Sequence, residues 1–152
     1  MRVSVVLAGA AAALSISASA NAAGVRADDA EIRNGWNAAR TCFEEVGEEL
    51  AHCATTLITE HGGESDKFLM GLTLGLWDDW NNGMAMVLIR NGVDADVSGY
   101  DLGARTSFKA MMKYKTRLGL TKKDLIDTYI TNREYAFKIW DADALEISDD
   151  GN

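Results

Sequence analysis

The sequence has 152 residues, a net charge of −8, two cysteines and no proline. Such an acidic chain is repelled by nucleic acid and by anionic lipid, which argues against both as partners. Because proline is absent and no segment repeats, we expect glycine-rich turns to separate the elements of one helical domain.

The first 22 residues have the pattern of a secretory signal peptide. Arg2 precedes an apolar run from Val3 to Ile16, and the segment Ala20–Ala22 fits a cleavage site. We therefore expect residues 1–22 to be removed and residues 23–152 to form a single exported helical domain. In a Gram-negative bacterium this domain would reside in the periplasm.

The first part of the mature chain predicts a helix that conflicts with its own cysteines. Apolar and small residues recur at alternating spacings of four and three between Ile32 and Leu57, as in an amphipathic helix. On one unbroken helix, Cys42 and Cys53 would be about 16 Å apart, whereas a disulfide needs Cα atoms within about 7 Å. Either the chain breaks between them, at Gly47 or near Glu44, or the thiols stay unpaired. We favour the disulfide, because exported proteins with two cysteines commonly pair them.

The residues that most often carry chemistry do not form a recognisable set. His52 and His61 have no serine, cysteine or carboxylate at the spacing of a hydrolase motif. Together with the two cysteines they are residue types that zinc prefers, but the paired spacings of familiar zinc sites are missing. We therefore expect no catalytic residue, no metal and no cofactor.

The segment Ser65–Asn91 is the most apolar part of the mature chain, and the rest is expected to pack around it. On a helical wheel its apolar stripe consists of Phe68, Leu69, Leu72, Leu76 and Trp80. Gly71 and Gly75 lie four residues apart, so another helix can approach closely there, and we assign these two glycines to helix packing. We expect Asn81–Gly83 to kink or end the helix.

Two adjacent carboxylates, Asp78 and Asp79, lie between Trp77 and Trp80. A carboxylate pair among aromatic residues is typical of glycosidases, but adjacent residues on a helix point about 100° apart. We expect one of them on the solvent face and the other at a helix boundary. Together with Lys67 they also interrupt the apolar run, which excludes a membrane span.

The remaining elements complete a small bundle. Asn91–Asp101 is an acidic loop rich in turn-forming residues. A helix is predicted from Leu102 to Leu118, and another begins after Thr121, with Asp124 at the capping-box position. The expected fold is all-α, a small orthogonal bundle of four to five helices with one disulfide.

The sequence resembles the Rap/Tai family, the periplasmic immunity proteins that protect bacteria from type VI secretion effectors. The residues that carry the resemblance are Phe68, Gly71, Gly75 and Asp78 in one helix, the helix start Asp101, Leu102 and Gly103, and the aromatic residues Tyr114 and Phe137. The chain differs from the family between the last two helices. Members usually have a proline there, whereas this sequence has Leu118, Gly119 and Leu120.

The resemblance implies a stoichiometric inhibitor that binds a secreted effector enzyme, such as a peptidoglycan amidase, and changes no bonds itself. We expect the acidic loop with Asp94, Asp96 and Tyr100 to form the contact surface. The sequence is also compatible with a homodimer. The same outline is similar to small acid-stress chaperones of the HdeA kind, and an uncharacterised periplasmic binding module is a third possibility.

Overall fold

The protein is an all-α bundle, as the sequence predicts. The computed structural model describes the backbone of residues 25–150 and the side chains of residues 25–136, so the predicted signal peptide lies outside the described residues. Its elements are α2 (Ala30–Ala39), the short 3-10 helix η2 (Arg40–Cys42), α3 (Gly47–Glu60), α4 (Asp66–Asn91), α5 (Ser98–Arg117) and α6 (Lys122–Asp150). This part of the chain contains no strand.

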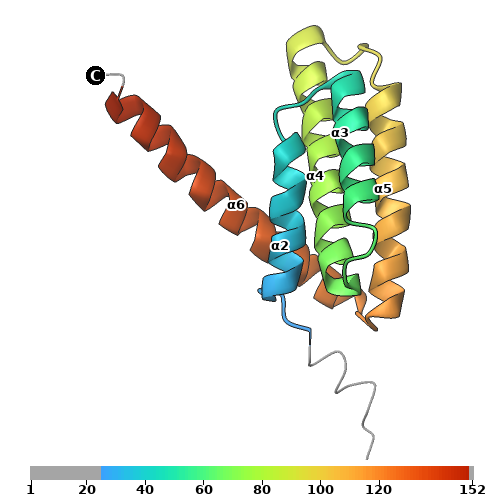
Figure 1. Cartoon of the computed structure of the whole chain (residues 1–152). Helices are drawn as coiled ribbons and strands as arrows, with labels where there is room; N and C mark the ends of the chain where they lie inside the picture. Colours follow the sequence, from blue (N-terminus) through green and yellow to red (C-terminus); the bar gives the residue numbers. More distant parts are fainter. Residues whose placement is uncertain (1–24, 151–152) are drawn as a thin grey trace, which may run out of the picture.

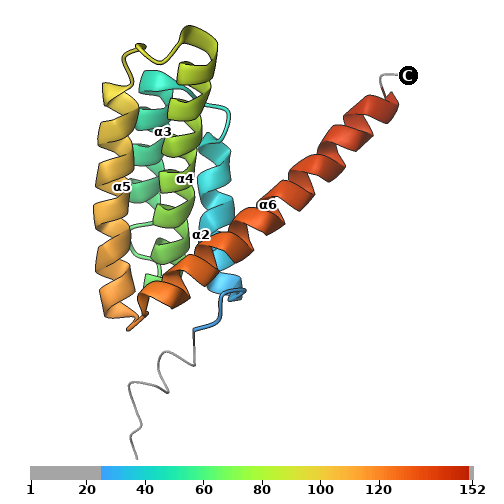
Figure 2. The same cartoon turned by 180° about the vertical axis from the view of Figure 1, so that it is seen from behind.

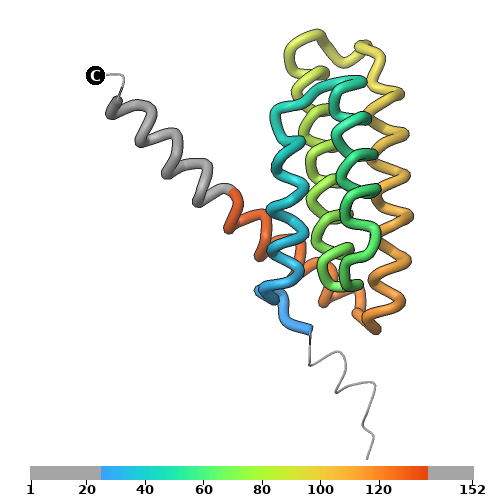
Figure 3. The backbone as a smooth tube through the Cα atoms, in the orientation of Figure 1, coloured from blue at the N-terminus to red at the C-terminus, as the bar shows by residue number. Residues whose placement is uncertain are grey.

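Four of the helices are nearly aligned. Figures 1 and 2 show α2, α3, α4 and α5 side by side, with α6 crossing them obliquely near one end. In the tube view of Figure 3 the chain runs in one direction through α2 and α4 and returns through α3 and α5. Short connections favour such antiparallel neighbours. The bundle is therefore less orthogonal than expected, and α6 alone among these helices departs clearly from the common direction.

The chain breaks between the two cysteines, as the disulfide requires. Helix α2 ends at Ala39 and continues as η2 through Cys42, and α3 begins at Gly47 after four connecting residues. The φ angle of Gly47 is +56°, a conformation that glycine adopts without strain. The prediction of an interrupted helix, with Gly47 as a candidate break, is confirmed.

Helix α4 lies at the centre of the bundle because it is apolar around most of its circumference. One face, with Leu72, Leu76 and Trp80, packs into a cluster formed with η2, α3 and α5. The opposite face, with Met70 and Leu74, packs into a second cluster formed with α2, α5 and α6. The predicted stripe therefore describes one of two buried faces.

Helices α2 and α4 approach each other through glycines. A side chain at Gly71 would overlap the carbonyl oxygen of Ile32, and one at Gly35 would overlap the carbonyl oxygen of Phe68. At Gly75 a Cβ would lie 2.6 Å from the Cβ of Ala39. The structure thus places Gly71 and Gly75 of α4 against α2. Gly35 of α2 likewise lies against the backbone of α4.

Helix α4 runs unbroken through Asn81–Gly83, contrary to our expectation of a kink or an end. The Asn81 side chain donates to the carbonyl of Trp77 at 2.8 Å, and the Asn82 side chain donates to Asp78 at 3.1 Å. Gly83 leaves room for the ring of Tyr100, since a Cβ there would clash with that ring. Side-chain hydrogen bonds within α4 and the packing of Tyr100 on Gly83 therefore offset the low helix propensity of this tripeptide.

Helix α5 begins earlier than predicted, whereas α6 begins with the predicted capping box. Helix α5 starts at Ser98, four residues before the predicted Leu102. At the start of α6, the Asp124 amide donates to Thr121 Oγ1 at 3.1 Å and the Thr121 amide donates to Asp124 Oδ2 at 2.9 Å. This reciprocal pair confirms the predicted capping box.

Within the described residues, no helix combines the length and the apolar character needed to cross a membrane.

The close contact of α2 and α4 predicts that Gly71→Ala destabilises the fold. The added methyl group must push the two backbones apart, at a cost of about 3 kcal/mol in the free energy of unfolding. Urea denaturation measures this cost. Gly63→Ala is the matched control, since a Cβ at Gly63 meets nothing within 4 Å. Equal stability of the two variants would contradict the assigned packing role.

Candidate functional site

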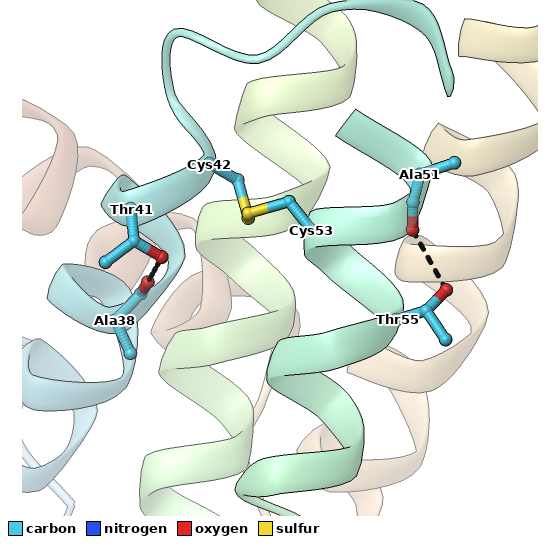
Figure 4. Close-up of a disulfide and its surroundings, with 6 residues drawn as sticks. All are labelled: Ala38, Thr41, Cys42, Ala51, Cys53 and Thr55. Carbon is cyan, nitrogen blue, oxygen red and sulfur yellow. Dashed lines mark hydrogen bonds between the residues drawn. A yellow bond between two sulfur atoms is a disulfide. The ribbon is translucent and has the colours of Figure 1, made fainter. Parts of the chain in front are cut away.

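A disulfide closes one end of the bundle. Figure 4 shows Cys42 at the end of η2 bonded to Cys53 in α3. Their Cα atoms are 5.7 Å apart. Cys42 is fully buried. Helix α3 buries three further side chains in the bundle, those of Leu50, Ala54 and Leu57. The covalent bond therefore supplements a modest apolar contact in holding α3 to the bundle.

Asp78 is buried in α4 and has several partners, contrary to the expectation of a solvent face or a helix boundary. The Tyr129 hydroxyl from α6 donates to Asp78 Oδ1 at 2.5 Å, and Arg133 Nε lies 3.4 Å from the same oxygen. Burial and the hydrogen bond to Asp78 raise the pKa of Tyr129. The carboxylate of Asp78 thus joins α4 to α6.

Asp79 is equally buried but less well satisfied. The residue is 7% exposed, and within the described part of the chain its Oδ2 atom has no hydrogen-bond partner. Burial and, after it, repulsion from Asp78 raise the pKa of Asp79 to about 8, although Arg40 acts in the opposite direction. The group is therefore protonated at neutral pH, and its burial costs free energy without a compensating hydrogen bond.

An acid beside a carboxylate resembles the pair of a glycosidase, but the position of these two groups prevents that chemistry. Both residues are buried in the middle of the bundle, and the Asp78 side chain is only 12% exposed. A general acid must come within hydrogen-bonding distance of its substrate. In this conformation both carboxyl groups offer little surface to a substrate.

The two histidines lie apart from these carboxylates. His52 is exposed in an open depression of about 740 Å³ along α3, which is also lined by the glutamates 45, 48, 49 and 60. His61 follows the end of α3, where its ring stacks on Phe68 at 4.9 Å and Nδ1 lies 3.5 Å from Glu64. In the described part of the chain, no group of three or more potential ligands is arranged to hold a metal ion.

The predicted contact loop is only partly as expected. Asp94 and Asp96 are exposed in the connection between α4 and α5. Asp96 accepts hydrogen bonds from the amide and the hydroxyl of Ser98, at 3.0 and 2.7 Å. The backbone hydrogen bond from Ser98, followed by the hydroxyl bond, lowers the pKa of Asp96. Asp96 therefore stabilises the first turn of α5, while Asp94 is exposed in the loop.

The assignment of Tyr100 to the loop surface is wrong. Because α5 begins at Ser98, Tyr100 lies within the helix and its ring packs edge-on against Trp80 at 5.9 Å. Its hydroxyl accepts a hydrogen bond from the Gly47 amide at 2.9 Å. Tyr100 thus connects α5 to the first residue of α3 and supports the closed end of the bundle.

The sequence reasoning missed a group of exposed apolar side chains at this same end. We call them the apolar end, and they are Phe43, Val46, Met86, Ile89 and Val93. Val93 is 86% exposed, Ile89 78% and Val46 60%. A signal was present in the sequence, since Met84–Ile89 are six consecutive apolar residues, which cover every face of a helix. Exposed apolar groups of this kind mark interaction surfaces.

No protein-family model, curated protein or solved structure matches the chain. The resemblance to the Rap/Tai family therefore stays a prediction based on the motifs named above.

The disulfide predicts a clear cost for its removal. Replacing both Cys42 and Cys53 by serine is expected to lower the free energy of unfolding by about 2 to 4 kcal/mol, because the unfolded chain is no longer constrained. Hydrogen exchange should accelerate more in α3 than in α4. The reduced wild type serves as the control. If the variant and the reduced wild type kept full stability, the structural role of the bond would be refuted.

The raised pKa of Asp79 predicts how stability changes with pH. Between about pH 4 and pH 8 the unfolded chain loses this proton and the folded chain keeps it, so wild-type stability falls as the pH rises. Asp79→Asn lacks the effect. Its stability advantage should grow between pH 5 and pH 8 by on the order of 3 kcal/mol.

Urea denaturation at the two pH values measures this difference. Asp94→Asn is the matched control, because Asp94 is exposed. An advantage of Asp79→Asn that is the same at pH 5 and pH 8 would show that the carboxyl is not protonated in the fold.

Proposed function

We propose that this chain is an exported inhibitor that binds another protein, of the type represented by the periplasmic immunity proteins against type VI secretion effectors. Its target would be a secreted enzyme such as a peptidoglycan amidase. The observation that carries the proposal is the apolar end, because protein contacts are commonly centred on exposed apolar side chains.

The scaffold behind the apolar end suits an inhibitor. The disulfide and the hydrogen bond from Gly47 to Tyr100 restrict movement at this end, and the α2–α4 glycine contact holds the first half of α4 in place. A surface that is already ordered loses less conformational entropy on binding. Affinity can then come from a small number of apolar contacts.

The expected location of the protein and the burial of its carboxyl pair both support this role. A disulfide is compatible with an oxidising compartment, and the signal-peptide pattern points to export, which we interpret as location in the periplasm. Asp78 and Asp79 are the described pair closest in type to a catalytic set, and both are buried. Their burial supports a role in binding over a role in bond cleavage.

An acid-stress chaperone of the HdeA kind is less well supported. Such a protein must loosen its fold as the pH falls so that it exposes surface to unfolded clients. Asp79 acts in the opposite direction, because the folded chain already holds this proton at neutral pH whereas the unfolded chain takes it up only near pH 4, so stability rises as the pH falls over that range. This carboxyl therefore stabilises the fold under acid conditions.

A contact-killing experiment tests the proposed function. A strain of the source bacterium lacking this gene should grow normally alone but be killed when it grows on a surface beside its parent, because it can no longer neutralise the effector it receives. Viable counts of the deletion strain after co-culture measure the effect, with at least a tenfold loss expected. A plasmid copy of the gene should restore survival.

A parent without a working type VI secretion apparatus is the matched control, and beside it the deletion strain should survive. Undiminished survival beside the intact parent would refute the immunity role.

A further inference from the structure

The last turns of α4 extend beyond the helices that cover the rest of it. Gly83 lies against the ring of Tyr100, in the first turn of α5, so α4 residues after about Ala85 pass the start of α5. On the other side, Gly75 lies against Ala39 at the end of α2. In Figure 1 α4 continues past the α2–α3 connection. At 1.5 Å per residue, Met86–Asn91 form a projection about 9 Å long.

The projection exposes the continuation of a buried stripe. Gly71, Gly75, Met86 and Ile89 fall within a narrow arc of the helical wheel of α4. The first two are covered by α2, whereas Met86 is 43% and Ile89 78% exposed. Beyond the end of α2, the side chains of this stripe become partly or largely exposed. Phe43 and Val46, in the connection that follows η2, are exposed at the same end.

The two chain segments that carry the apolar end have one dominant sign of charge. Residues 43–49 and 84–97 contain the acidic residues Glu44, Glu45, Glu48, Glu49, Asp94 and Asp96 and one basic residue, Arg90. None of the four glutamates takes part in an ion pair within the described part of the chain. They are exposed, and their negative field is available to a partner.

The exposed apolar stripe and the acidic residues together favour one kind of binding partner. A second copy of the chain would bring the same glutamates against themselves, and an anionic membrane would be repelled. An acidic surface around an apolar stripe complements a surface with apolar residues at its centre and lysine or arginine at its edge.

We propose that the apolar end is the docking surface for a protein with an apolar centre and a basic rim. This inference rests on the proposed function and specifies the chemistry of the partner. The apolar contact supplies most of the affinity, and the glutamates attract and orient the basic rim.

A defined probe tests the docking surface. The probe is an 18-residue amphipathic helical peptide of leucine and lysine, compared with its leucine–glutamate counterpart. In NMR titrations of the oxidised mature protein, the lysine peptide should shift the amide signals of residues 43–49 and 86–93, and its affinity should fall with salt. The glutamate peptide should bind at least tenfold more weakly.

Substitutions separate apolar docking from simple charge attraction. Ile89→Asp and Val93→Asp make the protein more acidic, so a purely electrostatic attraction for the lysine peptide would become stronger. Apolar docking instead predicts at least tenfold weaker binding for each. Ile58→Asp is the matched control, since it makes the same charge change at a 48% exposed isoleucine in α3 and should bind like the wild type. Glu48→Gln with Glu49→Gln should reduce the salt dependence.

Several results would overturn the proposal. These are unchanged or tighter binding by Ile89→Asp and Val93→Asp, signal shifts confined to other surfaces, binding to neutral phosphatidylcholine vesicles through this end, or a dimer in sedimentation equilibrium that Ile89→Asp dissociates. Killing of the deletion strain together with such a result would mean that the inhibitor function holds and another surface performs it. Peptide docking without killing would retain the surface and reject the immunity role.

Discussion

The close approach of α2 and α4 is the constraint on which the other features of the fold depend. Gly35, Gly71 and Gly75 remove the side chains that would keep these helices apart. Since α4 then has α2 directly against it, apolar residues on its other faces are free to bind the remaining helices. A glycine in a helix costs about 1 kcal/mol relative to alanine, and the packing achieved here offsets that cost.

The closed end of the bundle shows how separate contacts stabilise one region. The disulfide joins η2 to α3, and Tyr100 accepts a hydrogen bond from the residue that begins α3. Close to this region, Asp79 is buried, and one of its oxygens has no hydrogen-bond partner among the residues whose side chains are described. An unsatisfied buried group lowers stability, so the strong contacts around it are needed to keep this end ordered. The projecting turns of α4 are thereby held on a firm base.

The proposed role follows from the apolar residues of α4 that remain exposed in the folded protein. A central helix that is apolar on all faces is stable only where neighbours cover it. Met86 and Ile89 lie beyond those neighbours, so the sequence retains there an apolar stripe that the fold does not use. The nearby glutamates keep this surface soluble and restrict the partners that can approach it.

The sequence alone determined the helical class, the conflict between Cys42 and Cys53 on one helix, the packing glycines of α4 and the capping box at Thr121, because each depends on local geometry or short-range periodicity. Only the tertiary structure decided the burial of Asp78 and Asp79, the continuity of α4 through Gly83 and the inward position of Tyr100. These three features depend on which helices lie opposite one another. Residues 50 or more positions apart create that environment, as Tyr129 does for Asp78 and Tyr100 does for Gly47, and no local pattern encodes it.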